Sequence, residues 1–281
     1  MLINWYPGHM NKARRKVKEI MPRVDVVIEV LDARLPQSST NPMIESLRGS
    51  KPYLKVLSKS DLADPKVTEA WQAQFREQRQ TDAIAITTEN PKLARSIPDR
   101  VMSMLPEKRP PGRPPTAMIL GIPNVGKSTL INTLAGRKVA TVGNEPAVTK
   151  AQQKIPLSNG LQLIDTPGMM WPGSKDELVN YRLATTGAIR DTAMAYDDVA
   201  MFALDYMLQR YPQRVSELYS LKDLPEHAHE TLELIAQSRG CAKGRSVDWK
   251  RAGEIFVRDL RSGKMGAISL EEPSREITYR E

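Results

Sequence analysis

The sequence is poor in cysteine and has no long apolar run. Cys241 is the single cysteine among 281 residues, which excludes a disulfide within the chain. No apolar stretch approaches the roughly 18 residues that a membrane-spanning helix needs. The first ten residues also lack the continuous apolar segment of a secretory signal. We therefore expect no membrane span and a cytoplasmic location.

Positive charge gathers at both ends of the chain, whose formal net charge is +8. Residues 1–23 contain six Lys or Arg and one Glu, and residues 239–264 contain eight Lys or Arg and three acidic residues. Because neutralising phosphates releases counterions, two basic ends favour a polyanionic partner such as RNA. A basic helix face can also serve solubility alone. The candidate RNA contacts in the second basic end are Arg245, Lys250 and Arg251.

A complete phosphate-binding pattern, Gly-Ile-Pro-Asn-Val-Gly-Lys-Ser-Thr, occupies residues 121–129. The apolar run before it predicts a buried strand, and the run after it predicts a helix. Glycines in such a loop let backbone N–H groups turn toward phosphate oxygens beside a helix N-terminus. Lys127 is expected to reach the β- and γ-phosphates, and Ser128 to ligate Mg²⁺. The pattern predicts a nucleoside triphosphate ligand, in contact with Asn124, Val125, Gly126, Lys127, Ser128 and Thr129.

Two downstream segments complete the predicted phosphate site. Asp165 ends an apolar run and begins Asp-Thr-Pro-Gly, where a carboxylate can hold Mg²⁺ through water and the N–H of Gly168 can sense the γ-phosphate. Between the two motifs, Thr149 offers a second hydroxyl to the metal, although a lone Thr in a loop is often only solvated. We expect Ser128, Thr149 and Asp165 to be the Mg²⁺ ligands.

The residues expected to read the base lie upstream of the phosphate loop. The run 53–57 predicts a strand that ends in Ser58-Lys59-Ser60-Asp61, where GTPases usually have Asn-Lys-x-Asp. Asp61 keeps the carboxylate that accepts hydrogen bonds from guanine. The shorter Ser58 side chain is expected to lose one or two bonds or to bridge them through water. A second predicted strand leads into Thr87 and Thr88, where GTPases usually carry a Ser-Ala pair beside the base.

Strands alternating with helices predict an α/β domain with a mainly parallel sheet over residues 1–175. The segment 106–115 contains five prolines and is expected to be an extended connector. Residues 176–281 have helical periodicity and predict a small all-α domain, which we expect to bind RNA. The basic segment 10–21 predicts an amphipathic helix, and 91–105 predicts one further helix.

Base-reading motifs that precede phosphate-binding motifs are typical of circularly permuted P-loop GTPases, which this chain resembles. Further similarity is to the ribosome biogenesis GTPase A family, or YlqF group. It lies in Asn4–Met10, Asp32–Pro36, Asn41-Pro42, Asp165–Gly168 and, at the C-terminal end, Gly263–Gly266 and Leu270-Glu271. The resemblance implies a GTP hydrolase, slow alone and stimulated by ribosomal particles, that assists assembly of the large ribosomal subunit. It implies GTP and GDP as ligands, rRNA or a large-subunit precursor as partner, and a monomer.

The resemblance also implies how the γ-phosphate is cleaved. Many GTPases orient the attacking water with a Gln after the Gly of the third motif, but Met169 stands there. In the family the histidine corresponding to His9 is proposed as catalytic; it can equally be a turn residue that bonds locally. Asn124 corresponds to the Asn that helps coordinate K⁺ in potassium-dependent GTPases, or it is a structural amide.

Two other functions stay open from the sequence. Met169 is compatible with a nucleotide-dependent RNA-binding switch that has negligible turnover. Ser58, in place of Asn, is compatible with a small ATPase whose base choice is relaxed. Multiple-turnover assays and competition between ATP and GTP distinguish these alternatives from the GTPase.

Overall fold

The computed structural model describes residues 10–109, 111–141, 153–166, 176–244 and 246–273. Contacts divide the chain into two compact units. The sheet unit comprises Tyr6–Pro172 and the short segment Glu271–Pro273, and the helical unit is built mainly from Gly173–Leu270. Residues 271–273 thus belong to the sheet unit although they follow the helical unit in sequence.

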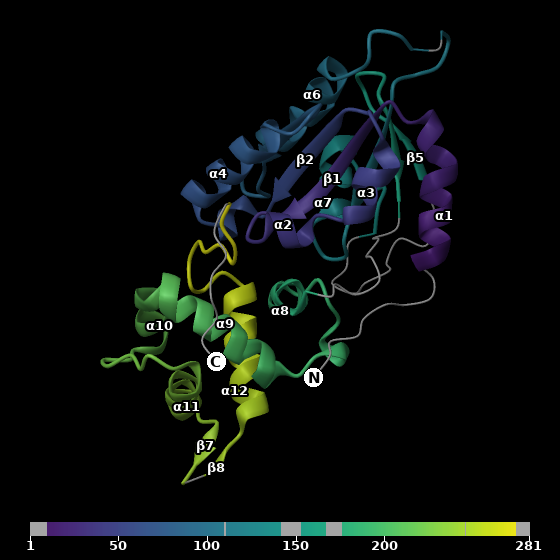
Figure 1. The fold of residues 1–281 in the computed structure, drawn as a ribbon. Helices are drawn as coiled ribbons and strands as arrows, with labels where there is room; N and C mark the ends of the chain where they lie inside the picture. The colour runs from purple at the N-terminus through teal and green to yellow at the C-terminus, as the bar shows by residue number, and fades with distance from the viewer. Residues whose placement is uncertain (1–9, 110, 142–152, 167–175, 245, 274–281) are drawn as a thin grey trace. The chain divides into compact units, whose positions relative to one another are not determined.

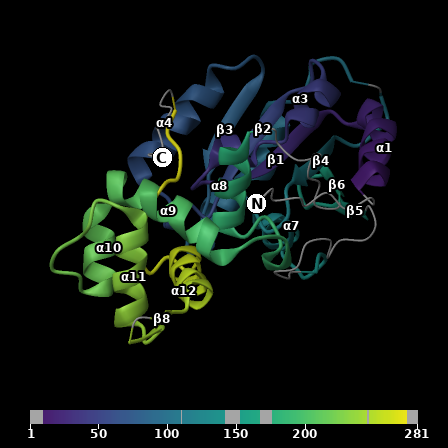
Figure 2. The same ribbon diagram turned by 60° about the horizontal axis from the view of Figure 1, so that its bottom comes forward.

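The sheet unit contains a six-stranded sheet (Figure 1), whose strand order is β3-β2-β1-β4-β6-β5 (Figure 2). All neighbouring strands are parallel except the edge pair β5 and β6. Every residue of β1, β2 and β4 is buried, as expected for a parallel sheet covered on both faces. The strands are β1 (Val26–Asp32), β2 (Tyr53–Ser58), β3 (Thr81–Ala85), β4 (Thr116–Gly121), β5 (Gln153–Pro156) and β6 (Gln162–Asp165).

Helices pack against this sheet and form two hydrophobic clusters with it. Val17, Ile44 and Tyr53 meet in one cluster, and Trp71 and Phe75 are buried in the other. The helices are α1 (Met10–Ile20), α2 (Pro36–Ser39), α3 (Pro42–Arg48), α4 (Pro65–Arg76), α5 (Pro91–Arg95), α6 (Ile97–Ser103) and α7 (Lys127–Ala135), with single 3-10 turns η1 (Met21–Arg23) and η2 (Ser60–Leu62).

The order of strands in space differs from their order in the chain at the centre of the sheet. After the edge strand β3 the chain returns to the middle, where β4 pairs with β1 and Val26 lies opposite Ala117. The proline-rich segment 106–115 makes this return, and Asp25 anchors it. Its carboxylate accepts hydrogen bonds from Arg109 at 3.3 Å, from Arg113 at 2.5 Å and from the Thr116 N–H at 2.9 Å.

Helices dominate the second unit (Figure 2). Side chains of α9, α11 and α12 form its interior, including Val199, Leu232 and Phe256, all fully buried. Gly253 allows α12 to approach the start of α9, because a Cβ there would lie 2.6 Å from the Tyr196 carbonyl oxygen. The elements are α8 (Glu177–Thr186), η3 (Asp191–Ala193), α9 (Tyr196–Arg210), α10 (Pro212–Tyr219), α11 (Ala228–Ser238), β7 (Ala242–Lys243), β8 (Ser246–Val247) and α12 (Trp249–Arg261).

The fold class is confirmed, with three differences in detail. The helix expected over 91–105 is divided at Ser96 into α5 and α6, because Pro98, in the first turn of α6, has no N–H to donate to the preceding turn. The all-α region also contains the hairpin β7–β8, whose two-residue strands are too short for a periodic pattern. The edge strand β5 was not predicted. None of the described helices is long and apolar enough to cross a membrane.

Candidate nucleotide-binding site

The predicted phosphate loop connects the C-terminal end of β4 with the N-terminus of α7, and two glycines are required by its geometry. A Cβ on Gly121 would lie 2.9 Å from the Val30 carbonyl oxygen, so a side chain there would collide with the backbone of β1. Gly126 has φ +88° and caps α7 in a left-handed conformation. Asn124 also has a positive φ, +62°. The loop therefore turns its backbone sharply where a phosphate is expected to bind.

Lys127 and Asp165, the two charged residues expected around phosphate and metal, contact each other. The Nζ of Lys127 donates to Oδ1 of Asp165 at 2.5 Å, and both side chains are buried. Burial raises the pKa of Asp165, and the positive charge of Lys127 opposes that effect in part. The residue after Asp165 holds the end of β6 in place, because the Thr166 hydroxyl donates to the Ile119 carbonyl at 2.9 Å. Ser128 and Thr129 lie in the first turn of α7 and are half-buried.

The hydroxyl of Ser58 faces the backbone of the phosphate loop. Its Oγ contacts two carbonyl oxygens, of Leu31 at 2.8 Å and of Val125, which share the single hydroxyl proton. The side chain is buried, so the serine supports the loop by direct contact with its backbone. Ser58 thus joins the ends of β1 and β2 to the loop after β4.

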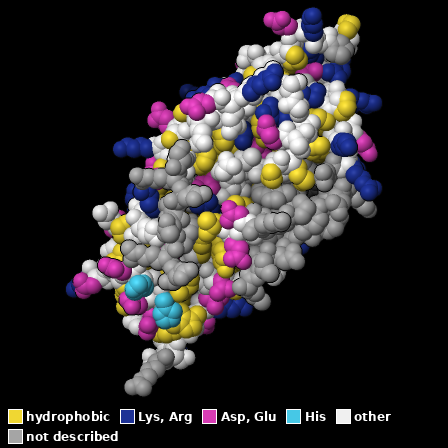
Figure 3. Space-filling view, viewed as in Figure 1, with side chains coloured by type: hydrophobic (Ala, Val, Ile, Leu, Met, Phe, Trp, Pro, Cys, Tyr) yellow, Lys and Arg dark blue, Asp and Glu magenta, His cyan; other side chains and the backbone are white. Residues whose placement is uncertain are grey.

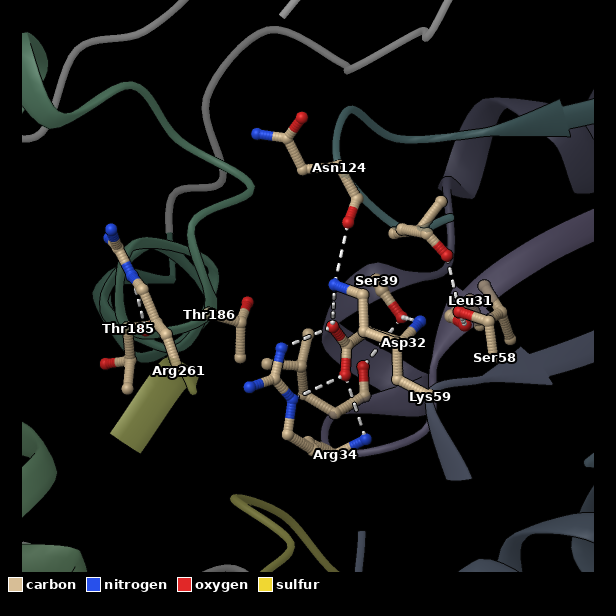
Figure 4. Close-up of polar contacts among 12 residues, drawn as sticks. Leu31, Asp32, Arg34, Ser39, Ser58, Lys59, Asn124, Thr185, Thr186 and Arg261 are labelled. Atoms are coloured by element: carbon tan, nitrogen blue, oxygen red, sulfur yellow. Dashed lines mark hydrogen bonds and ion pairs between the residues drawn. The ribbon is translucent and has the colours of Figure 1, made fainter. Parts of the chain in front are cut away.

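Lys59 makes a second connection to the phosphate loop from Ser58–Asp61, the predicted base-reading loop (Figure 4). Its Nζ donates to the Asn124 carbonyl oxygen at 2.7 Å and to Oδ2 of Asp32 at 3.0 Å. Asp32 also accepts from Arg34, through Nε at 2.9 Å and Nη2 at 2.8 Å. Burial alone would raise the pKa of Asp32, but the positive charges of Arg34 and Lys59 hold it well below its usual range.

Asp61 and Thr87 come together at the ends of neighbouring strands. The Thr87 hydroxyl donates to Oδ1 of Asp61 at 2.6 Å, which fixes one carboxylate oxygen. Asp61 and Thr88 are exposed, and Thr87 is half-buried. Lys59 adopts φ +56°, which begins the turn that presents Asp61 at the edge of the sheet. A carboxylate held in this way can accept hydrogen bonds from a bound ligand.

The structure does not describe every predicted site residue. His9, Thr149, Gly168 and Arg245 lie outside the described residues. Lys250 and Arg251 are exposed at the start of α12 in the helical unit. On the face shown in Figure 3, Lys and Arg side chains border the sheet unit and are interspersed with Asp and Glu.

Sequence reasoning gave no structural role to three residues that support this site. Asp32 and Arg34 served only as marks of a family resemblance, and Glu271 only as part of a similar C-terminal end. The structure places Asp32 against Lys59, and Glu271 against α2, which follows β1. No hydrophobic period or motif spacing signals such contacts, because each one joins segments far apart in the chain.

Comparisons with known proteins agree with this geometry. The family model described as "50S ribosome-binding GTPase" matches residues 116–236, beginning at β4. The ribosome biogenesis GTPase A of Priestia megaterium is 44% identical over 98% of this chain and 98% of its own length. The GDP-bound structure of TM YlqF covers 93% of this chain and 100% of its own, with 27% identity and a TM-score of 0.67. The structure of GNP-bound YlqF from T. maritima covers 94% of this chain and 99% of its own, with 27% identity and a TM-score of 0.65.

Proposed function

We propose, from the premise that this chain belongs to the ribosome biogenesis GTPase A family, that it binds and hydrolyses GTP during assembly of the large ribosomal subunit. The observation that carries the proposal is the direct connection between the two halves of the site. Ser58 and Lys59 from the base-reading loop both bond the backbone of the phosphate loop. A ligand with a guanine base and a phosphate chain fits between groups held in this way.

The phosphate loop supplies positive charge and backbone N–H groups to the phosphates. Lys127 leaves Asp165 to contact the β- and γ-phosphates, where its charge stabilises the negative charge that moves toward the leaving group as the bond to γ-phosphorus breaks. The N-terminus of α7 and the N–H of Gly168 act on the same oxygens. Val125, Gly126 and Thr129 line the phosphates through their position in the loop and the first helical turn.

Mg²⁺ fits the oxygen donors of this chain. Among the described residues no group of three or more His, Cys, Asp or Glu side chains is placed to hold an ion. The hydroxyl of Ser128 and the carboxylate of Asp165 suit Mg²⁺, which binds through few protein oxygens and completes its shell with phosphate and water. Ser128, Thr149 and Asp165 would hold it. When bound, the ion neutralises charge on the β- and γ-phosphates.

Water activation requires residues outside the phosphate loop. His9 would orient or deprotonate the attacking water, since an imidazole titrates near neutral pH. Asn124 would help coordinate K⁺ beside the phosphates, which adds positive charge in the manner of an arginine finger. Hydrolysis is slow in the free protein and is stimulated on ribosomal particles.

Base selection depends on Asp61. Its carboxylate accepts from the guanine N1–H and exocyclic amine, and it repels the N1 acceptor of adenine. Thr87 fixes the carboxylate and Thr88 borders the base. The chain acts as a monomer in the cytoplasm, and Arg245, Lys250 and Arg251 of the helical unit contact phosphates of rRNA.

A hydrolysis assay with one matched control tests the enzymatic part. Lys127→Ala should abolish measurable GTP turnover, because it removes the charge that contacts the phosphates. Lys66→Ala replaces an exposed lysine of α4 and should turn over GTP like the parent. Far-UV circular dichroism checks that both variants fold. Normal turnover in folded Lys127→Ala would refute the placement of the site.

Sedimentation tests the assembly role. The protein is mixed with large ribosomal subunits in the presence of GDP or a non-hydrolysable GTP analogue and run on a sucrose gradient. We expect co-sedimentation in one nucleotide state and release in the other. Failure to bind in either state, by a protein that hydrolyses GTP, would refute a ribosomal role and leave the GTPase activity standing.

A further inference from the structure

We infer that Glu271, near the C-terminal end of the chain, is a positioning residue for the guanine-reading loop. The inference rests on the proposed function, because it concerns how the same nucleotide site is held in shape. Glu271 lies in the short segment that belongs to the sheet unit after the chain has completed the helical unit. It acts through α2 and Asp32, and it does not itself touch the nucleotide.

The Glu271 carboxylate accepts three hydrogen bonds from α2. Oε1 accepts from the backbone N–H groups of Gln37, at 2.5 Å, and Ser38, at 2.9 Å. Oε2 accepts from the Ser38 hydroxyl at 2.5 Å. The Glu271 carbonyl also accepts from Nε1 of Trp71 on α4, at 3.3 Å. Glu271 is only 4% exposed, so these charge-assisted bonds replace the water that the carboxylate has lost.

α2 needs such support because it contains only four residues. An isolated helix of that length is not stable, since its N-terminal N–H groups have no partners within the helix. Its last residue, Ser39, contacts β1 directly. The Ser39 hydroxyl accepts from the N–H of Asp32 at 3.1 Å and donates to the Leu35 carbonyl at 2.8 Å. Ser39 therefore joins α2 to the backbone of Asp32, which β1 also holds in register opposite Ser58.

Asp32 transmits that position to the nucleotide site. Its carboxylate holds Lys59, whose Nζ also donates to the Asn124 carbonyl of the phosphate loop. Lys59 stands two residues before Asp61, the predicted guanine acceptor. Glu271 thus bonds Ser38, and the next residue in the chain, Ser39, bonds Asp32. Figure 4 shows the contacts from Ser39 through Asp32 to Lys59, at the start of the loop that is expected to read the base.

Nucleotide exchange in the full-length protein tests this inference. Glu271→Ala should speed dissociation of fluorescent GDP by roughly three- to tenfold, because contacts in one network are coupled. It should also reduce the ratio of GDP to IDP affinity, since IDP lacks the exocyclic amine that Asp61 accepts from. Glu271→Gln, which keeps the side-chain shape, should change both quantities in the same direction by less. Glu69→Ala replaces an exposed glutamate of α4 and should change neither.

A double-mutant cycle separates positioning from general support of the fold. If Glu271 acts through Lys59, then Glu271→Ala should add little to the faster GDP release of Lys59→Met. Additive effects, or a lower melting temperature with an unchanged GDP to IDP ratio, would overturn the inference. If Glu271→Ala does not fold, an unchanged ratio in folded Glu271→Gln overturns it. A parent protein that does not bind GDP refutes the proposed function as well, whereas normal binding by parent and Glu271→Ala alike refutes the inference alone.

Discussion

Replacing Asp32 by alanine should lower the free energy of unfolding of the sheet unit by about 3–5 kcal/mol, the cost of breaking a buried ion pair from one side. Asp32 accepts from both Arg34 and Lys59, but the two cations differ in access to water. The Lys59 side chain is 27% exposed and can turn outward, whereas the Arg34 side chain is 2% exposed. Nearly the whole penalty therefore comes from a guanidinium left buried without its counterion.

Two further variants test whether the lower free energy of unfolding of Asp32→Ala comes from the buried Arg34. Asp82→Ala also removes a carboxylate that pairs with two arginines, but those side chains are 36% and 46% exposed. We expect it to cost less than about 1 kcal/mol, as exposed pairs do. Asp32→Ala combined with Arg34→Met removes both buried charges and should be more stable than Asp32→Ala alone.

Equilibrium unfolding in urea provides the assay, with hydrogen exchange of peptides from β1 and β2 to identify the sheet unit. Because the pKa of Asp32 is depressed in the folded protein, its contribution is complete above the unfolded value of about 3.9 and declines as the pH falls below it. The difference between parent and Asp32→Ala should shrink in that acidic range. A loss below about 1 kcal/mol at neutral pH would refute the argument that Arg34 depends on this carboxylate.

The remaining predictions concern nucleotide and RNA. Ser58→Asn should bind GDP at least as tightly as the parent in fluorescence titration, and weaker binding would mean that the loop is adapted to serine. His9→Ala should keep GTP binding and ribosomal docking but lose most of the stimulated rate in single-turnover assays; undiminished stimulation would make His9 a turn residue. Exchange of Na⁺ for K⁺ should accelerate the parent but not Asn124→Ala. Reversing the charges of Lys250 and Arg251 should weaken docking and reduce its salt dependence by about one to two log–log units, and unchanged docking would leave that face merely solvated.

Much of the sheet unit could be predicted from the sequence because its strands are continuous apolar runs. β1, β2 and β4 are buried on both sides, and their apolar composition indicates this burial without any knowledge of the elements that pack against them. β5 escaped prediction because it is a four-residue edge strand with a single buried residue, Ile155. α2 escaped because four residues provide no helical period and its stability comes from Glu271.

The residues of the candidate site could be predicted where they form one contiguous motif. Contacts between residues far apart in the chain could not be predicted. The spacing of the phosphate loop suffices to place Lys127 and Ser128 at the start of a helix. From the sequence we expect Ser58, which is shorter than the usual asparagine, to lose one or two bonds or to bridge them through water. The structure adds a contact between the Ser58 hydroxyl and the Val125 carbonyl, which no motif spacing signals because the two residues lie 67 positions apart.

The strand order makes each half of the sheet one uninterrupted piece of chain. Residues 26–85 supply β1 to β3 with the base-reading loop, and residues 116–165 supply β4 to β6 with the phosphate loop. Within the sheet the two pieces meet along the strand pair β1 and β4, and Ser58 and Lys59 join them again at the phosphate loop. A nucleotide whose base is bound by one piece and whose phosphates are bound by the other would hold the two pieces together without a covalent bond. At a ligand concentration of 100 times Kd, it would add about 2.7 kcal/mol to the association of the two halves.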